Sequence, residues 1–312
     1  MPAEATSSSN NPHLIYRGHS DYIFSLAFSP ASTMLASASR DTTVRVWRIN
    51  LSRMESEDIT VYREHTNSLL AVAWSPGGTY IASGDTSGAI HIWNAFSSET
   101  ILIYRGHTRF ARSIAWSPDG TYIVSGGDFG DSTAQVWEAF TGNLLYTHTR
   151  QYRVFAAAWK PRGKHVATCS FDGTVMIWDA LAGDVVLTYS GHSGPVYTAA
   201  WSPDGALITS AGQDGVIQIW DAATGQTIHS YSGYTKAVKS LAWSPDSLHI
   251  VSGGDDMQVH VWTPATGEYV ILDQDHHKWI RAVAWSPDGD MIAATSDHTV
   301  QVVNNVLMNL AN

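Results

Sequence analysis

Residues 115–120 read AWSPDG, and variants of this hexapeptide recur along the whole chain. The seven copies are AFSPAS, AWSPGG, AWSPDG, AWKPRG, AWSPDG, AWSPDS and AWSPDG, with prolines Pro30, Pro76, Pro118, Pro161, Pro203, Pro245 and Pro287. Successive prolines are 46, 42, 43, 42, 42 and 42 residues apart. Ser-Pro-Asp-Gly favours a tight turn, because proline presets φ, aspartate accepts local backbone hydrogen bonds and glycine tolerates positive φ. A turn at this nearly fixed period indicates a repeat architecture.

The runs between these turns favour short β-strands. Stretches such as TVMIW (174–178), VIQIW (216–220) and QVHVW (258–262) are rich in β-branched and aromatic residues. A second turn, TGN, AGD, TGQ or TGE, follows several of these runs, so each repeat is predicted to hold four antiparallel strands. Helical periodicity is nowhere sustained. The sequence therefore predicts an all-β fold, a seven-bladed β-propeller of four-stranded antiparallel blades.

Tryptophans recur at two positions of the repeat. The first column is Trp74, Trp116, Trp159, Trp201, Trp243 and Trp285, with Phe28 in blade 1. The second column is Trp47, Trp93, Trp137, Trp178, Trp220 and Trp262, with Val303 in blade 7. Aromatic residues that follow a repeat period are expected to pack between neighbouring blades, and they do not indicate a cofactor site.

The two ends of the chain are predicted to close the ring together. HLIYR (13–17) precedes Gly18-His19 as ILIYR (101–105) precedes Gly106-His107, and the last repeat stops near its third strand. We expect the N-terminal strand to pair into the last blade, which removes an open sheet edge. Residues 13–304 then form the propeller, and residues 1–12 and 305–312 are expected to be a disordered N-terminal tail and a C-terminal tail.

Composition narrows the class of protein. The formal net charge of −10 argues against a protein that coats nucleic acid over its whole surface. Cys169 is the only cysteine, so neither an internal disulfide nor a cysteine zinc site is expected. The N-terminus lacks the basic and apolar regions of a signal peptide, and no apolar run approaches the length of a membrane span. We expect a cytoplasmic monomer without cofactor or metal.

Short motifs add a family resemblance. Gly-His pairs stand at 18–19, 106–107 and 191–192, and Trp-Asp pairs stand at 178–179 and 220–221. Together with the seven registered copies, they resemble the WD-repeat family over residues 13–304, and the regular AWSPDG turns are similar to those of prokaryotic arrays of this family. The resemblance implies a non-catalytic scaffold for partner proteins.

The resemblance also implies a structural role for most of the polar residues. In this family a His, Ser, Asp and Trp tetrad ties the strands of a blade together. The matching residues are His19, Ser37, Asp41 and Trp47 in blade 1, His107, Ser125, Asp131 and Trp137 in blade 3, and His192, Ser210, Asp214 and Trp220 in blade 5. A catalytic triad would need one activated site with an oxyanion hole, whereas this set recurs around the ring.

Four blades depart from the tetrad pattern and are expected to be held less firmly. The departures are Ser87 in the Asp position of blade 2, Arg150 and Tyr234 in the His positions of blades 4 and 6, and Ala294 and Val303 in blade 7. Arg150 is expected to form an ion pair with Asp172. His276 is expected to occupy the structural His position of blade 7, because the adjacent His276 and His277 of one strand point to opposite faces and lack a third metal ligand.

The variable residues gather after each His position, where the first strand of a blade begins at one mouth of the central channel. Seven six-residue windows, each starting at the His position of its repeat, contain eight of the 18 Lys and Arg residues and a single acid, Asp21. By resemblance, this is where family members contact peptides. The predicted partner-binding residues are Tyr22, Phe24, Arg109, Phe110, Arg112, Arg153, Phe155, Tyr197, Lys239, Trp279 and Arg281. Asp85, Asp128 and Asp255 are expected to offset part of this charge.

Arginines and aromatic residues at a rigid concave mouth suit an acidic or C-terminal group of a peptide. A general protein-binding face is an alternative, as is a hydrolase-type propeller enzyme. The enzyme would need convergent carboxylates or His ligands aimed at the channel, whereas the windows hold mainly cations and aromatic residues there. Binding of single-stranded nucleic acid to the same basic, aromatic mouth is a third alternative, although the net charge makes it less favoured. The chain could also be the scaffold part of a longer architecture.

Overall fold

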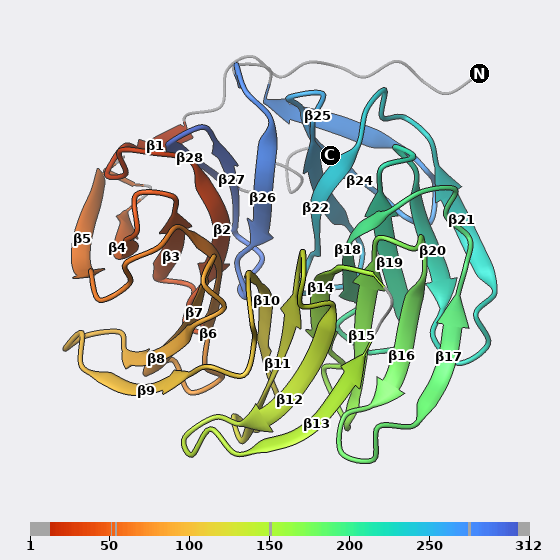
Figure 1. The fold of residues 1–312 in the computed structure, drawn as a ribbon. Coiled ribbons are helices and arrows are strands. Elements are labelled where there is room, and N and C mark those ends of the chain that lie inside the picture. Colours follow the sequence, from red (N-terminus) through yellow and green to blue (C-terminus); the bar gives the residue numbers. More distant parts are fainter. Residues whose placement is uncertain (1–12, 51, 54, 150–151, 274–275, 305–312) are drawn as a thin grey trace.

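The computed structural model describes residues 13–50, 52–53, 55–149, 152–273 and 276–304. They form seven four-stranded antiparallel sheets, arranged as blades around a central channel (Figure 1). The predicted fold class is therefore confirmed. Within these residues no helix is long and apolar enough to cross a membrane. The two predicted tails and Arg150 lie outside the described residues, so the expected ion pair between Arg150 and Asp172 stays a prediction.

The strands follow the repeats in order. Blade 1 contains β2 (Ile23–Phe28), β3 (Met34–Ser39), β4 (Val44–Asn50) and β5 (Glu55–Tyr62). Blade 2 contains β6 (Leu69–Trp74), β7 (Tyr80–Asp85), β8 (Ile90–Asn94) and β9 (Thr100–Tyr104). Blade 3 contains β10 (Ala111–Trp116), β11 (Tyr122–Gly127), β12 (Thr133–Glu138) and β13 (Leu144–Thr149). Blade 4 contains β14 (Val154–Trp159), β15 (His165–Ser170), β16 (Val175–Asp179) and β17 (Val185–Tyr189).

The remaining blades continue this order and end by returning to the N-terminus. Blade 5 contains β18 (Val196–Trp201), β19 (Leu207–Gly212), β20 (Ile217–Asp221) and β21 (Thr227–Tyr231). Blade 6 contains β22 (Val238–Trp243), β23 (Ile250–Gly254), β24 (Val259–Trp262) and β25 (Tyr269–Asp273). Blade 7 contains β26 (Ile280–Trp285), β27 (Met291–Ser296), β28 (Thr299–Asn304) and β1 (His13–Tyr16).

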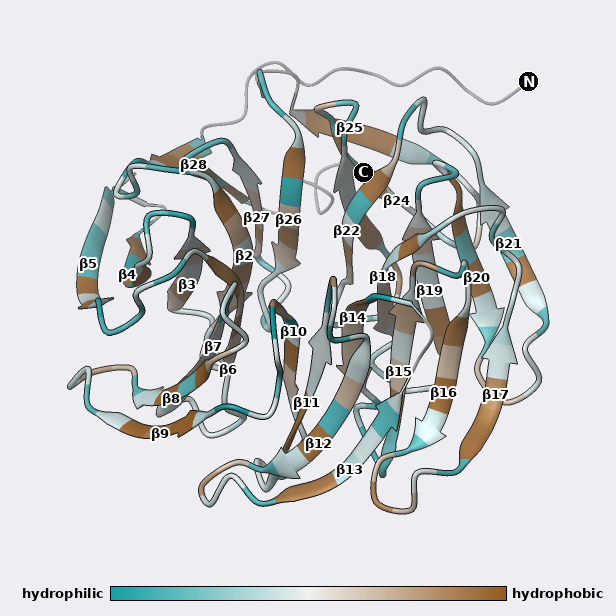
Figure 2. Cartoon of the chain, viewed as in Figure 1, coloured by the Kyte–Doolittle hydropathy of each residue, from teal (hydrophilic) through white to brown (hydrophobic). Residues whose placement is uncertain are grey.

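Burial changes from the middle of each blade to its rim. All six residues of β3 and of β27 are buried, whereas four of the five residues of β21 are exposed. Figure 2 shows apolar bands on strands around the whole ring, including the outer strands β9 and β17. Because both faces of the middle strands pack against neighbouring blades, their residues are apolar or small, with a few buried polar groups that the tetrads use. The hydrophobic core is thus a ring of interfaces between blades.

Both tryptophan columns lie in these interfaces. The six tryptophans of the second column are at most 2% exposed. Several tryptophans of the first column donate their indole N–H to a backbone oxygen of the preceding blade, as Trp74 does to Ala27 at 3.0 Å and Trp116 to Ala73 at 3.2 Å. Indole rings supply large apolar areas, and a buried indole N–H needs an acceptor. One residue type thus both packs and orients adjacent blades.

The ring closes through the N-terminal strand, as predicted. β1 pairs antiparallel with β28, from His13 opposite Val303 to Tyr16 opposite Val300. Blade 7 therefore takes its outermost strand from the start of the chain and its other three strands from the end. This pairing covers the edge of β28 and joins the termini of the propeller into one sheet.

Hydrogen-bonded tetrads hold blades 1, 3 and 5. In blade 1, Nδ1 of His19 lies 2.8 Å from Asp41 and Nε2 lies 2.8 Å from Ser37, which also accepts the Trp47 indole N–H at 3.4 Å. The same bonds join His107, Asp131, Ser125 and Trp137 in blade 3, and His192, Asp214, Ser210 and Trp220 in blade 5. These networks satisfy polar groups that are largely buried.

Blade 2 differs from the expectation that its Asp position is lost. Asp85, the last residue of β7, lies 2.8 Å from Nδ1 of His65, and Ser83 completes the network with His65 and Trp93. Ser87, in the expected position, donates to the Asp85 carboxylate. The carboxylate reaches the histidine from a position two residues earlier in the chain, so blade 2 has a complete network. The prediction that this blade is less firmly held was wrong in its premise.

The other departures are replaced in different ways. In blade 6 the Tyr234 hydroxyl donates to Ser252 at 2.8 Å in place of a histidine. In blade 4 Thr168 accepts the Trp178 indole N–H at 3.2 Å. His276 is buried in blade 7. Whether these blades are less firmly held than the others stays a prediction.

Candidate partner-binding site at the channel mouth

A β-bulge interrupts the innermost strand of every blade near its start. The pairing of β10 with β11 skips Arg112, between Ala111 and Ser113, and the pairing of β2 with β3 skips Phe24. The other skipped positions include Leu70, Phe155, Tyr197, Lys239 and Arg281. A bulge leaves one residue out of the ladder and re-aims its side chain. The repeat thereby turns one residue per blade toward the channel.

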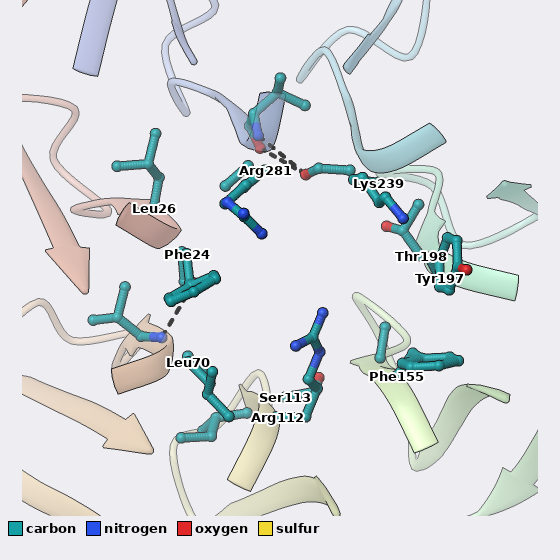
Figure 3. Close-up of a pocket in the computed structure, with 18 residues that line it drawn as sticks. Phe24, Leu26, Leu70, Arg112, Ser113, Phe155, Tyr197, Thr198, Lys239 and Arg281 are labelled. Carbon is teal, nitrogen blue, oxygen red and sulfur yellow. Dashed lines mark hydrogen bonds between the residues drawn. The ribbon is translucent and has the colours of Figure 1, made fainter. Parts of the chain in front are cut away.

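These seven bulged residues surround one central cavity. The cavity has a volume of ≈ 210 Å³, and all seven side chains belong to its lining. Figure 3 shows Arg112 and Arg281 extending inward from opposite sides, with Phe24, Phe155, Tyr197 and Lys239 around them. Three cations and three aromatic rings therefore meet where the blades come closest to the axis.

Each cation of this ring lies over an aromatic ring of an adjacent blade. The guanidinium carbon of Arg281 is 4.8 Å from the centroid of Phe24 and 5.1 Å from that of Tyr22. Arg112 lies 5.9 Å from Phe155, and Lys239 lies 4.0 Å from Tyr197. Cation–π attraction holds a charge in place while leaving its hydrogen-bond donors free. The aromatic residues thus hold the three cations in place around the cavity.

Two carboxylates neutralise part of this charge. Asp128 lies 3.9 Å from Arg112 and 3.5 Å from Arg153, and Asp255 lies 3.3 Å from Lys239. Asp85, which we expected beside them, is instead buried in the network of blade 2. Among the described residues, no carboxylate oxygen comes within 4.0 Å of a nitrogen of Arg281. Of the three cavity cations, Arg281 is therefore the one that forms no ion pair with the residues that the structure describes.

The charges of Arg112 and Arg281 repel each other across the cavity. Burial lowers the pKa of the Arg281 guanidinium below its usual value and the nearby charge of Arg112 lowers it further, while Tyr22, Asp255 and Asp297 partly oppose this shift. Burial lowers the pKa of Arg112 as well, while Asp128 raises it and Arg153 lowers it. Both arginines keep their charge at neutral pH, because a guanidinium group is not deprotonated in proteins. Two like charges that face one cavity are stabilised when an anion lies between them.

The other predicted partner-binding residues lie around the cavity. Arg153 lies over Phe129 at 4.6 Å and over Phe171 at 5.7 Å. Trp279, Tyr22 and Arg281 line a second cavity of ≈ 250 Å³ beside the first. Arg109 is exposed and Phe110 half-buried in the loop before β10, and neither contributes to the lining of the central cavity. The structure thus brings together most of the predicted set, but not these two residues.

Two contributors to the mouth lie outside the predicted set. Phe129 is 55% exposed on the loop between β11 and β12, where blade 3 has two more residues between its tetrad Ser and Trp than blades 1, 2 and 5. Met257 lines the second cavity from the turn between β23 and β24. In the sequence, the longer spacing between Ser125 and Trp137 indicates an extended loop that contains Phe129. Met257 stands out once the turns are aligned, because blades 1 to 5 carry glycine, serine or threonine there.

A cluster of possible metal ligands lies elsewhere in blade 2. The ligand atoms of His65, Asp85 and His91 lie within 4.8 Å of one another. Both ring nitrogens of His65 contact Asp85 and Ser83, and Nδ1 of His91 lies 2.8 Å from the Tyr62 hydroxyl. These hydrogen bonds account for the arrangement as part of the blade network.

Comparison with known proteins supports the repeat assignment. The family described as "WD domain, G-beta repeat" matches residues 10–48, 56–94, 98–138, 142–179, 183–221, 225–263 and 269–304. The human F-box-like/WD repeat-containing protein TBL1Y is 28% identical over 187 residues, which are 59% of this chain and 29% of that protein. Mouse TBL1X is 27% identical over 183 residues, 58% of this chain and 28% of that protein. The Arabidopsis thaliana protein CIA1 is 42% identical over 57 residues, 16% of each. The chain thus matches less than a third of the length of these relatives.

Proposed function

Because this chain belongs to the WD40 family, we propose that it is a non-catalytic scaffold that binds a partner protein through acidic groups at the channel mouth. The seven-bladed ring supplies a rigid frame. Each bulged residue lies between residues that are paired in the sheet, so little ordering of the backbone is needed when a partner binds. The partner is expected to present an acidic side chain, or a C-terminal carboxylate, to the central cavity.

The charge balance of the mouth is the observation that carries this proposal. Arg112, Arg153, Lys239 and Arg281 contribute four positive charges, whereas Asp128 and Asp255 are the carboxylates that pair with them. Two charges remain uncompensated by ion pairs, although the chain as a whole is strongly acidic. Guanidinium groups bind carboxylates with two parallel hydrogen bonds, which makes them specific receptors for such groups.

The same balance favours binding over catalysis. A hydrolytic site needs a carboxylate or histidine free to move a proton, and the two mouth carboxylates are engaged with cations. Binding of single-stranded nucleic acid to the mouth is the competing use of the same charges, and it would show a steep loss of affinity with salt. We further propose that the protein acts as a monomer in the cytoplasm.

Capture of partners from a cell extract tests the proposal. The wild type is compared with R112E/R281E, which reverses the two facing charges of the cavity. The matched control is R48E/R162E, which makes the same change of net charge at two exposed arginines away from the mouth. We expect the mouth variant to lose specific protein partners that the control retains. Equal capture by both variants would refute the mouth as the binding site, and retention of RNA or DNA alone would favour the nucleic-acid alternative.

A further inference from the structure

A second cavity lies beside the central one and shares Arg281 with it. It has a volume of ≈ 250 Å³ and is lined by Tyr22, Met257, His277, Lys278, Trp279 and Arg281. This volume is about eight times the roughly 30 Å³ that a water molecule occupies in the liquid. Arg281 also lines the central cavity, so one side chain forms a wall of both.

The second cavity has a large exposed aromatic residue at its rim. Trp279 is 52% exposed, and the neighbouring Tyr22 packs with its ring 5.1 Å from the Arg281 guanidinium. An aromatic residue in such a position is typical of a contact that is buried in a complex. The arginine separates this space from the positively charged centre.

Met257 provides an independent sign that the cavity has a function. Its φ of 68° lies in the left-handed region, where a side chain with a Cβ is disfavoured. The same turn position has positive φ in other blades, where it is occupied by the smaller residues Thr42, Gly88, Ser132, Gly173 and Gly215. Glycine adopts this conformation without strain. The conformation is thus common to this turn, and what distinguishes blade 6 is the long, adaptable thioether side chain that Met257 places in the cavity lining.

We infer that the second cavity binds a bulky apolar side chain, Phe, Trp, Leu or Met, of the same peptide whose acidic group enters the central cavity. This inference rests on the proposed function and specifies the partner's motif. Because Arg281 borders both cavities and an extended chain advances ~3.3 Å per residue, the acidic and apolar residues lie within about three positions of each other. Arg281 contacts the acidic group on one side and the apolar group on the other.

A peptide selection followed by a mutant cycle tests this motif. A random 12-residue phage-displayed library is selected on the full-length wild type, with R112E/R281E as the background. We expect enrichment of Asp or Glu within three positions of a bulky apolar residue. Enriched peptides with acids but no associated apolar residue would overturn the inference and leave the proposed function standing. Enrichment without acids, or no enrichment above the background, would contradict both.

The mutant cycle then assigns the apolar residue to this cavity. The strongest synthetic peptide and its apolar-to-Ala analogue are titrated against wild type, M257G, W279A and the control F96A, which removes an aromatic residue 54% exposed on another turn. We expect M257G and W279A to weaken the parent peptide roughly tenfold and the analogue little. M257G should keep the thermal midpoint within ~2 °C, since glycine relieves the positive φ. Equal weakening of both peptides, or no weakening, would overturn the assignment.

Discussion

The ring of Tyr16, on β1 of blade 7, stacks on the indole of Trp47 in blade 1, with centroids 4.2 Å apart and planes 7° from parallel. Comparable stacks join Tyr62 to Trp93, Tyr104 to Trp137 and Tyr189 to Trp220 across three further interfaces. The N-terminal strand therefore repeats, at the point of closure, the contact that three other interfaces make within the continuous chain. Closure depends on both strand pairing and this stack.

Loss of the closing contact is expected to destabilise the whole ring. Tyr16 is 5% exposed, so Y16A leaves a cavity and should lower the free energy of unfolding by about 3 kcal/mol. Deletion of residues 1–17 removes β1 entirely and should lower the thermal midpoint further. Calorimetry measures both effects, and Y152A, at a residue 46% exposed, serves as the control. An unchanged midpoint after the deletion would contradict closure by this strand.

Asp85 is expected to matter more to stability than Ser87, although Ser87 occupies the tetrad position. D85N removes the charged acceptor of buried His65 and should lower the free energy of unfolding by about 2 kcal/mol. S87A should have a smaller effect, because Asp85 keeps its bond with His65. Urea denaturation of both variants, with D184N at an exposed aspartate as control, distinguishes them. Equal effects of D85N and D184N would show that the network contributes nothing.

The same carboxylates make stability depend on acidic pH. Burial alone would raise the pKa of Asp85, but hydrogen bonds from His65 and Ser87 lower it below its ordinary value overall. The pKa values of Asp41 and Asp131 are lowered for the same reasons, with His19 and His107 as the partners. A lowered folded-state pKa means that the folded state binds protons less readily than the unfolded one. The resulting stabilisation is present above about pH 4 and decreases as the pH falls below it. Denaturation across pH 2 to 6 should show this decrease, and D85N should show a smaller one.

Asp128 is expected to compete with acidic ligands, because it occupies two of the mouth arginines. D128N should raise the affinity for a fluorescein-labelled hexaglutamate peptide several-fold, roughly the effect of removing one nearby like charge. Fluorescence anisotropy at low salt measures this affinity. D184N is the matched control, since it makes the same chemical change far from the mouth. No gain for D128N relative to D184N would mean that Asp128 does not compete.

Arg281 is expected to act through its guanidinium plane and not through its charge alone. R281K retains a positive charge but loses the planar donor group that lies over Phe24 and Tyr22. The affinity for hexaglutamate should fall about fivefold. K239R makes the reverse exchange, from an ammonium to a guanidinium, at another cation of the cavity. It controls for a general effect of exchanging lysine and arginine. Equal affinity of R281K and wild type would contradict a role for the plane.

Most of the architecture follows from residues that repeat with the blades. The Ser-Pro-Asp-Gly turns and the tryptophan columns predict seven blades, and HLIYR predicts the closing strand that the pairing of β1 with β28 confirms. These features are local or periodic, so each copy supports the others. The position of the mouth follows in the same way, because variable residues recur after each His position.

The finer geometry depends on contacts that the repeat does not contain. The bulge at Arg112 and its counterparts arises from how two strands pair, which the spacing of residues leaves open. Asp85 contacts His65 although the repeat places Ser87 in the Asp position. Side chains from either of these two backbone positions can reach the same histidine, and the repeat spacing does not say which one does. The bond of Asp128 with both Arg112 and Arg153 joins two blades. Pairwise distances of this kind are set by tertiary packing.

The affinity of hexaglutamate for three forms of the protein tests the central claim most directly. Anisotropy titrations at low and physiological salt compare wild type, R112E/R281E and R48E/R162E. The account predicts that wild type and R48E/R162E bind the peptide about tenfold or more tightly than R112E/R281E, with all affinities falling as salt rises. The two variants have the same net charge, so a difference between them locates the binding at the mouth. Equal affinity of the two variants would contradict the claim that the channel mouth binds acidic groups.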